Sequence, residues 1–509
     1  MSFHVSRFTF HNHRFTTWAS AIAALLAATL FRTLPLLDNR FHPDEALYAT
    51  FARLISSGQG VLLSYLVVDK PPLAFYLGAF SNLWVGGSEL GMRLPNFYAS
   101  VVSVALTWAL AHRLYSRPVA HLAAWALALS PFAILFSITV FLDPLLTAFC
   151  LWGWWMTAAG RYRWAALAWA LAWATKQTAL LLIPLTLALG LLTLPPTANL
   201  WEALRRLWRI TFPMLVGLAL VTLLILIWDA VCHPPVGFWD QGYSDNMPGR
   251  FIRANEIEPR ARAWLELLHF TTATPALNVA LLVGLPALWL FNLRRPTRAA
   301  LADILLTGYL ALFLAAYWLL AFNVWDRYLM PLLPLFALLF ARVMYGGWWM
   351  ARRFFESWNL NLSLSLSLLL PSSFFLMLLP ATLRAAHSGY PIGGDHGAYD
   401  GIDDVARYVH TLPPEGVLYD HWLSWEFNYY LFDRPLFIAW FPTPDALTTD
   451  LLSFGHTSPR YLVVPAWEAD TEMRAAAARA GFEFIPLHTT TRRDGSLSFT
   501  LYQLTPIGP

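Results

Sequence analysis

The stretch HPDEALYATFARLISSGQGVLLSYLVVDKPPL, residues 42–73, follows directly after the first strongly apolar run of the chain. It holds two acids, Asp44 and Glu45, and a lysine, Lys70, at the water edge of a membrane, where charges are costly and usually functional. Lys70 is one of only two lysines among the 34 Lys and Arg residues, and the other is Lys176. Because the chain uses Arg almost everywhere else, these two positions indicate a need for a compact, strongly hydrated ammonium group.

Composition excludes an ordinary soluble protein. Of the 509 residues, 57% are hydrophobic and 13% are charged, whereas soluble proteins average about 25% charged residues. Long apolar runs recur from about residue 17 to about residue 382, each near the roughly 20 residues that cross a bilayer. The net charge of +3 is too small to indicate nucleic acid, so the lipid bilayer is the partner that composition predicts.

Hydropathy predicts a membrane all-α bundle of about 11 transmembrane helices. With a cytoplasmic N-terminus, every cytoplasmic connection carries at least two arginines, and the short connections on the opposite side carry few positive charges. This pattern satisfies the positive-inside rule. We therefore predict a multi-pass protein of the cell membrane whose two lysines, Asp44-Glu45 pair and C-terminal tail lie outside the cytoplasm. The predicted spans are 17–37, 94–113, 118–137, 142–159, 164–176, 178–194, 211–231, 274–293, 300–322, 328–345 and 360–382.

The composition changes to soluble character beyond about residue 385. Runs of strand length (VLYD, PLFIAW, RYLVVPA) alternate there with helix-like stretches (DDVARYVHTL, EADTEMRAAAARAG), which is α/β patterning. The sequence thus predicts a transmembrane domain, residues 1–384, with outer loops at 38–93 and 232–273, and an extracytoplasmic α/β domain, residues 385–509. The first apolar run has no small-residue cleavage site after it and is expected to be a retained signal anchor.

The segment that begins at His42 is predicted to form an amphipathic helix on the membrane surface. Pro43 suits a first turn, and Ser56-Ser57-Gly58 is a stop signal. Adjacent helical residues point about 100° apart, so Asp44 and Glu45 cannot both face one point. Either both acids only complement the positive helix N-terminus, or one carboxylate takes a proton from an incoming hydroxyl.

Asp69-Lys70-Pro71-Pro72 is the second candidate element. Its two prolines force an extended backbone and so fix the position of the lysine. A lone interfacial lysine normally reaches toward lipid phosphate. The avoidance of Lys elsewhere favours the alternative, a point charge that binds a substrate phosphate.

Three further positions return to the same membrane face. Asp143 is an acid between two apolar stretches, so it needs a partner from another segment, and we expect it to orient the first loop. Lys176 is a candidate to pair with it or to bind phosphate. Arg327, with Tyr328 beside it, has Asp326 as an alternative partner, although adjacent residues meet poorly on a helix.

The outer segment 232–273 is rich in aromatic residues, Gly and Pro, and long loops of this kind are often functional. Its Arg250 is expected to reach a phosphate. A divalent metal could be bound by His233 and His269 together with Asp69 or Glu256, but no ligand-spacing motif is present. We therefore expect no cofactor, and a divalent metal stays an alternative that no motif supports.

Together these residues resemble the membrane glycosyltransferases that use a lipid-linked sugar. The nearest group is the bacterial branch of the protein O-mannosyltransferase and aminoarabinose transferase superfamily, which has the C-type glycosyltransferase fold. The resemblance covers roughly residues 17–345 in order. It is carried by Asp44-Glu45, Asp69-Lys70-Pro71-Pro72, Phe141-Leu142-Asp143-Pro144, Thr175-Lys176 and Arg327-Tyr328.

The resemblance implies transfer of a sugar from a polyprenyl-phosphate monosaccharide to an extracytoplasmic acceptor, with inversion. It makes Asp44 the candidate general base and gives Glu45 the task of orienting the acceptor or the loop. Lys70, Lys176 and Arg327 would hold the phosphate and neutralise its growing charge. Some relatives have Glu where this chain has Asp69, which is one methylene shorter. The acceptor, a glycan, a lipid or a protein, is left open.

Two other functions compete with the transferase. A polyprenyl-lipid transporter or flippase would also place basic residues at headgroup level, but it is expected to show internal repeats and broken helices near the midplane. A non-catalytic membrane scaffold would leave the placement of Asp44 and Lys70 unexplained. The isolated charges gathered at one membrane face therefore favour the enzyme.

Overall fold

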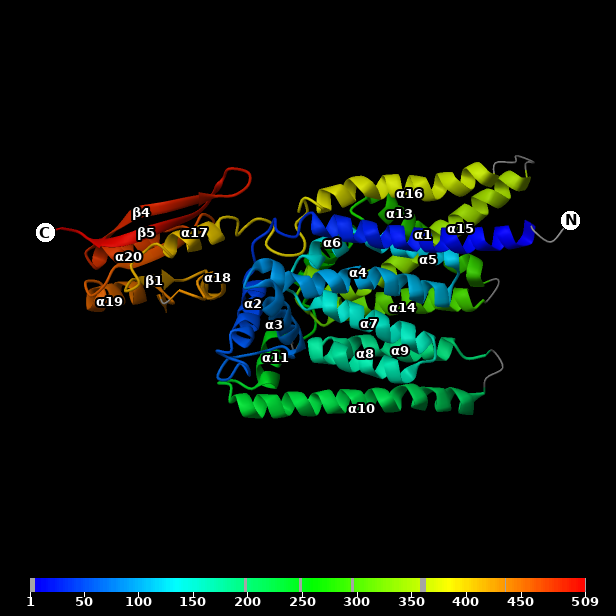
Figure 1. Ribbon diagram of the computed structural model, residues 1–509, viewed down its shortest axis with the longest axis horizontal. Coiled ribbons are helices and arrows are strands. Elements are labelled where there is room, and N and C mark those ends of the chain that lie inside the picture. Colours follow the sequence, from blue (N-terminus) through cyan, green and yellow to red (C-terminus); the bar gives the residue numbers. More distant parts are fainter. Residues whose placement is uncertain are drawn as a thin grey trace.

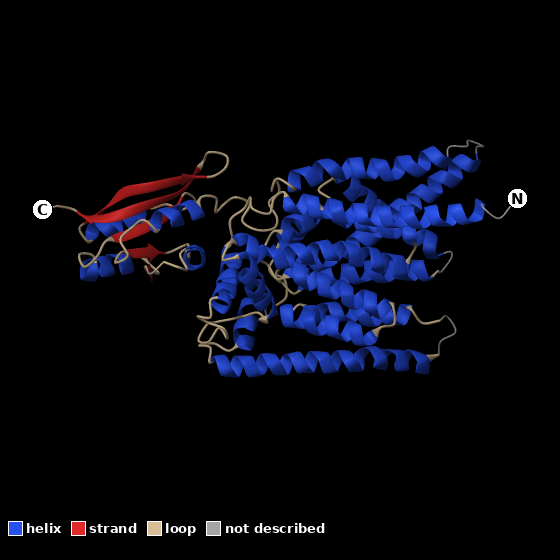
Figure 2. Ribbon diagram, viewed as in Figure 1, coloured by secondary structure: helices blue, strands red, loops and turns tan. Residues whose placement is uncertain are grey.

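The structure, a computed structural model, describes residues 5–195, 199–246, 250–293, 297–357, 363–434 and 436–508. Long helices run side by side in one part of the molecule, and a five-stranded sheet with its own helices lies beyond one end of them (Figures 1 and 2). Helices α2 (Pro43–Ser56), α3 (Leu73–Val85) and α11 (Phe238–Asn246) lie at that end of the long helices (Figure 1). The described chain thus has a helical bundle, an end layer and a part that contains the sheet.

The other helices of the bundle follow the apolar runs of the sequence. They are α1 (Val5–Thr33), α4 (Glu89–Leu114), α5 (Arg117–Ala128), α6 (Pro131–Ser137), α7 (Asp143–Ala158), α8 (Tyr162–Thr175), α9 (Ala179–Leu192), α10 (Leu200–Cys232), α13 (Pro275–Leu293), α14 (Arg298–Leu319), α15 (Leu333–Ser357) and α16 (Ser363–Ala385). Shorter elements connect them: η1 (Ala254–Glu256), α12 (Ile257–His269) and η2 (Asp326–Leu332).

Four helical stretches of the described chain are by themselves long and apolar enough to cross a membrane: Glu89–Leu114, Leu200–Cys232, Arg298–Leu319 and Asp326–Phe354. A fifth candidate is the pair formed by α5 and α6, which is bent by 55°. The sequence predicted one span there, 118–137. The bend falls at Ser130-Pro131, where a proline lacks the N–H that would continue the helix. The protein is therefore a multi-pass membrane protein.

Helix α2 begins and ends at the signals that the sequence contains. His42 is its N-cap and accepts a hydrogen bond from the Asp44 amide, and Pro43 occupies the first turn. The Glu45 side chain reaches back to the His42 amide, which completes a capping box. The helix ends at Ser56, next to Ser57 and Gly58, and its predicted bounds are confirmed.

The C-terminal sheet has the strand order β2-β1-β3-β5-β4, with β1, β2 and β3 parallel and β5 antiparallel to both β3 and β4. Side chains alternate between its faces, so Val417 and Tyr419 of β1 pack with α19 and α20, whereas Leu418 packs with α17 and α18. The strands are β1 (Val417–Asp420), β2 (Phe437–Trp440), β3 (Arg460–Pro465), β4 (Phe482–Thr491) and β5 (Leu497–Pro506). The helices are α17 (Ile402–Val409), α18 (Ser424–Tyr430), α19 (Pro444–Phe454) and α20 (Thr471–Arg479).

Candidate active site

Five residues proposed from the sequence meet in one small cavity at the end of the bundle that faces the sheet. They come from four separate parts of the chain, yet all line the same space: Lys70, Asp143, Lys176, Arg327 and Tyr328. The ring of Tyr48 and the segment Phe141-Leu142 complete the wall. The cavity therefore gathers three cations at a single point of the described chain.

Asp44 reaches this cavity through Arg327. The Arg327 Nη1 donates a hydrogen bond to Asp44 Oδ2 at 2.5 Å, across 283 positions of the sequence. The guanidinium also lies over the rings of Phe141 and Trp325, 5.1 and 5.5 Å from their centroids. Burial opposes the charge of Asp44, but the nearby Arg327 and its hydrogen bond outweigh burial and lower the pKa of the carboxyl. Asp44 is thus a charged acceptor at neutral pH, and its side chain is still 38% exposed.

Glu45 points away from Asp44, as expected for neighbours on a helix. Its side chain is buried, and its two oxygens accept hydrogen bonds from the amides of His42, at 3.1 Å, and Val140, at 2.7 Å. Burial raises the pKa of Glu45 to about 8, although Arg93 and these amide donors oppose the rise. Glu45 therefore ties α2 to the segment before Asp143, and of the two acids it is the one that caps the helix.

Asp143 and Lys176 form a buried pair. Lys176 Nζ lies 2.7 Å from Asp143 Oδ1 and 2.8 Å from Oδ2, and the two side chains are 6% and 2% exposed. Asp143 opens α7, and Lys176 follows the last residue of α8, so two helix ends bring the charges together. The ring of Tyr328 lies 5.3 Å from the ammonium. Asp143 thus has the partner from another segment that a buried acid needs.

Lys70 is buried and contacts the carboxylate of its neighbour Asp69. The Asp69 carbonyl also accepts a hydrogen bond from the Gln177 side chain at 2.5 Å, next to Lys176. The two lysine-bearing segments are therefore joined directly. Each of the three cations at this point has a carboxylate partner, so the site is close to neutral overall.

A second, larger cavity adjoins the first and shares Lys70, Lys176 and Tyr328 with it. It measures about 820 Å³. Its wall comes mostly from apolar and aromatic side chains of α9, α11 and α14: Leu180, Leu181, Pro184, Phe238, Trp239, Tyr309, Leu312, Phe313, Ala316 and Tyr317. A long apolar chain can lie here with a charged end at the lysines.

Arg250 is not brought to either cavity. Its guanidinium makes a bidentate contact with Glu256, both hydrogen bonds measuring 2.7 Å. Glu256 is only six residues away, so this surface ion pair forms without bringing distant parts of the chain together. The structure therefore separates Arg250 from the other candidate phosphate ligands.

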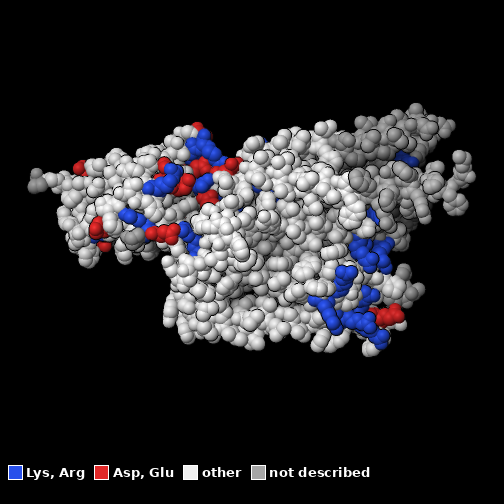
Figure 3. Space-filling model, in the orientation of Figure 1, with Lys and Arg blue, Asp and Glu red and all other residues white. Residues whose placement is uncertain are grey.

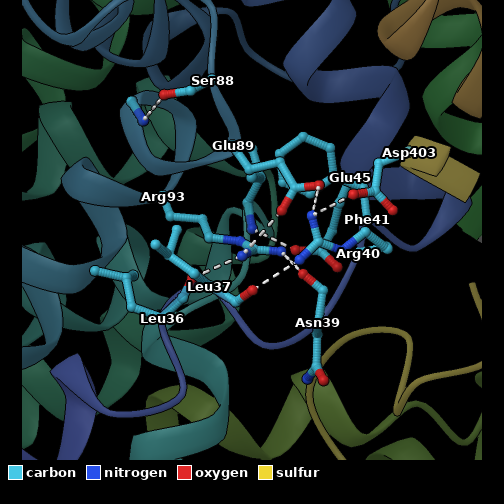
Figure 4. A network of polar contacts seen from close by, with 12 residues as sticks. Leu36, Leu37, Asn39, Arg40, Phe41, Glu45, Ser88, Glu89, Arg93 and Asp403 are labelled. Carbon is cyan, nitrogen blue, oxygen red and sulfur yellow. Dashed lines mark hydrogen bonds and ion pairs between the residues drawn. The ribbon is translucent and has the colours of Figure 1, made fainter. Parts of the chain in front are cut away.

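Sequence reasoning missed a network behind the loop that precedes Asp44. Glu89 and Arg93, at i and i+4 of α4, form an ion pair of 3.3 Å, and Arg40 contacts Glu89 at 3.1 Å (Figure 4). Arg93 donates to the carbonyls of Leu36 and Asn39 at 2.6 and 2.5 Å. The i, i+4 spacing was the one local signal.

Among the described residues, no group of three or more His, Cys, Asp or Glu side chains could hold a metal.

Comparisons with known proteins found glycosyltransferases of the kind that the sequence resembles. A family model described as dolichyl-phosphate-mannose-protein mannosyltransferase matches residues 69–228. A curated relative, undecaprenyl phosphate-alpha-4-amino-4-deoxy-L-arabinose arabinosyl transferase 1 of Pseudomonas fluorescens (strain Pf0-1), is 28% identical over 337 residues. The match spans 62% of this chain and 56% of the relative, a little over half of its length.

Solved structures share the fold over nearly the whole chain. ArnT from Cupriavidus metallidurans in the apo state gives a TM-score of 0.62 at 16% identity, covering 94% of this chain and 97% of ArnT. The undecaprenyl phosphate complex of that ArnT gives 0.57 at 18% identity, with 96% and 98% covered. The apo oligosaccharyltransferase of Archaeoglobus fulgidus gives 0.54 at 12% identity, with 94% and 74% covered. These structures confirm the resemblance to the C-type glycosyltransferases at the level of the fold.

Proposed function

We propose that this protein is a membrane glycosyltransferase that moves a sugar from a polyprenyl-phosphate monosaccharide to an acceptor hydroxyl outside the cytoplasm, with inversion. The observation that carries the proposal is the 2.5 Å contact of Asp44 with Arg327, which lines one cavity together with Lys70 and Lys176. This arrangement offers a proton acceptor beside a site for an anionic phosphate. The relative named for transfer from an undecaprenyl phosphate sugar supports the same class of donor.

In the proposed reaction, the acceptor oxygen forms a bond to the anomeric carbon while the bond from that carbon to the phosphate oxygen breaks. The acceptor proton passes to Asp44, and the electron pair of the broken bond stays on the polyprenyl phosphate. A single displacement of this kind inverts the anomeric centre. Phosphate needs no proton to leave, so one carboxylate base suffices, unlike the acid and base pair of a glycosidase.

Lys70, Lys176 and Arg327 are the proposed phosphate ligands. The phosphate gains a negative charge when the sugar leaves, so cations already fixed beside it stabilise the transition state more than the bound donor. Each of these cations now contacts an acid. A bound phosphate would therefore compete with carboxylates for the same donors, and its arrival at Arg327 would release Asp44 to accept the acceptor proton.

The adjoining cavity of about 820 Å³ is the proposed site of the polyprenyl chain. Its apolar and aromatic wall suits an isoprenoid, and its two lysines stand at the end where the phosphate would lie. The ArnT structure solved with undecaprenyl phosphate has the same fold, which makes that lipid the natural first probe.

We further propose eleven spans, formed by α1, α4, α5 with α6, α7, α8, α9, α10, α13, α14, α15 and α16. Basic side chains gather at the end of the bundle opposite the sheet, whereas acids and bases mix on the part that contains the sheet (Figure 3). By the positive-inside rule, the basic end is cytoplasmic and the α/β domain, residues 385–509, is extracytoplasmic. The transmembrane domain is then residues 1–384.

Release of undecaprenyl phosphate tests the proposal. Purified full-length protein is incubated with a panel of undecaprenyl-phosphate sugars that includes 4-amino-4-deoxy-L-arabinose, and released lipid phosphate is quantified by mass spectrometry. The wild type should release it from at least one donor. Asp44→Asn should be about 100-fold slower or worse, the usual loss for a general base, while still binding undecaprenyl phosphate.

The control is Arg209→Gln, which removes an exposed cation of α10 in the basic segment assigned to the cytoplasmic end. Its release rate should match the wild type. Full release by Asp44→Asn would remove Asp44 from the mechanism. Movement of the intact donor across a vesicle membrane without release would favour a flippase, and failure of both activities would favour a scaffold.

A further inference from the structure

The part of the chain that follows α16 contacts the neighbour of Arg327 and the loop that leads into Asp44. The segment 390–401, here called the strap, lies between α16 and α17. The Gly393 amide donates a hydrogen bond to Asp326 Oδ2 at 2.8 Å, and the other oxygen, Oδ1, accepts from the Arg327 amide at 2.7 Å. One carboxylate therefore connects the strap to the residue that carries the guanidinium.

The strap is fitted closely to the site. Gly393 has φ +72°, and a Cβ there would lie 3.0 Å from the Leu135 carbonyl carbon, so only glycine suits the position. Gly394 has φ +95°, and its Cβ would lie 3.4 Å from Glu45 Oε2. The strap thus passes between α6 and the N-terminus of α2 at van der Waals distance.

The second contact comes from α18, on the side of Asp44. The hydroxyl of Tyr430 accepts a hydrogen bond from the Phe41 amide at 3.1 Å and donates one to Glu89 Oε1 at 2.6 Å. Glu89 belongs to the network that fixes the loop before α2 (Figure 4). Asn39 in the same loop accepts a hydrogen bond from Arg493 at 2.6 Å. The loop that leads into Asp44 is therefore held from the C-terminal side as well.

The Asp44–Arg327 pair needs such support. The two side chains are 38% and 19% exposed, and a partly exposed ion pair alone contributes little to stability. An arginine also loses rotamer entropy when it is held in one geometry. Fixed backbones on both sides limit how far the two groups can separate.

We propose that Asp326 and Tyr430 are positioning residues through which the C-terminal part of the chain sets the contact between Asp44 and Arg327. The inference rests on the proposed function only for its catalytic consequence. Docking of the strap and of α18 assembles the base with its cation, and release of either contact separates them. The α/β part thereby controls the reactive carboxylate without touching a substrate.

Loss of the contact changes the acidity of Asp44. The nearby Arg327 and its hydrogen bond lower the pKa of the Asp44 carboxyl, so a displaced Arg327 lets that pKa rise. The acid limb of kcat/KM should then move to higher pH. The groups that face Asp44 are His42, Arg327, Lys70, Tyr48, Tyr328, Tyr399 and Glu426.

The test compares Asp326→Asn and Tyr430→Phe with a matched control, Tyr419→Phe. Tyr419 lies in β1 and loses one hydrogen bond, to Asp450, on the face of the sheet that packs with α19 and α20 and not with α17 and α18. Two readouts are used on the purified full chain. The first is hydrogen exchange in peptides that cover 36–45, 326–332 and 390–401, and the second is the pH profile of undecaprenyl phosphate release.

Tyr430→Phe should raise exchange in all three peptides at least threefold, including 390–401, which Tyr430 does not contact by any hydrogen bond described above. Both variants should shift the acid limb upward, and Tyr419→Phe should do neither. Faster exchange confined to 36–45, with an unmoved acid limb, would overturn the coupling. Coupled exchange in a protein that releases no lipid phosphate would uphold the coupling and reject the proposed function.

Discussion

The buried pair of Lys176 with Asp143 allows a double-variant test in which stability should be regained while activity stays lost. At 2.7 Å and an effective dielectric of about 20, the two charges attract by about 6 kcal/mol. Desolvation of both groups offsets most of that attraction. Removal of one partner leaves a charge that is buried without compensation, and such losses are about 3–5 kcal/mol.

Lys176→Met and Asp143→Leu should therefore each lower the free energy of unfolding by about 3–5 kcal/mol, as measured by SDS titration of tryptophan fluorescence in mixed micelles. The double variant should regain most of that loss, because it buries no charge. It should nevertheless stay inactive in the undecaprenyl phosphate release assay, because a proposed phosphate ligand is gone.

The matched control is Arg262→Met. Arg262 pairs with Glu258 on α12 at 2.5 Å, but the side chains are 78% and 74% exposed, so the loss should be about 0.5 kcal/mol or less. The reasoning is refuted if Lys176→Met and Asp143→Leu cost no more than this control and their effects simply add. It is refuted equally by a double variant that keeps wild-type turnover.

Three further outcomes are expected. Glu45→Gln should flatten the pH dependence of thermal stability. The pKa of Glu45 is about 8 in the folded protein and near 4.5 in the unfolded chain, so its contribution to stability is fully present below pH 4.5. That contribution is lost by about 1.4 kcal/mol per pH unit as the pH rises from 4.5 through 8. Unchanged pH dependence of the melting temperature would contradict this. Gly393→Ala should destabilise more than Gly58→Ala, because both positions have positive φ but only Gly393 meets the Leu135 backbone; equal melting temperatures would reject the close fit. Treatment with EDTA should leave donor turnover unchanged, because three side-chain cations already converge on the proposed phosphate site.

Local signals predicted much of the end layer of the bundle. Pro43 and the Ser-Ser-Gly stop gave the bounds of α2, and the need of a buried acid for a partner pointed from Asp143 to Lys176. The angle of about 100° between adjacent helical residues predicted that Asp44 and Glu45 point in different directions. The helix bounds could be predicted because start and stop signals act over a few residues. The pairing of charges could be predicted because the cost of charge in a membrane confines charged side chains to one plane.

The contacts between the C-terminal part and the loop that leads into Asp44 had no such signal. Phe41 and Tyr430 are 389 positions apart, and Asn39 and Arg493 are 454 apart. No periodicity or composition links residues at that separation, because only the closed fold brings them together. Arg250 and Asp326 had a different cause, local competition. Glu256, six residues away, pairs with Arg250, and Asp326 uses its carboxylate on the amides of Arg327 and Gly393 and makes no ion pair with the Arg327 side chain.

The pairing of every site cation with an acid resolves an apparent conflict between the membrane and the proposed chemistry. Three bare cations at a bilayer edge would be costly to desolvate, yet a site for a phosphate that gains charge needs them close together. Pairing keeps the site nearly neutral until an anion arrives, and each acid then has its own fate. Asp143 and Asp69 lie beside their lysines within the wall, whereas Asp44 is the most exposed of the three and sits on a helix that the C-terminal part holds. The acid that a phosphate would displace most easily is therefore the one that faces outward to an acceptor, so occupation of the donor site and exposure of the base become a single event.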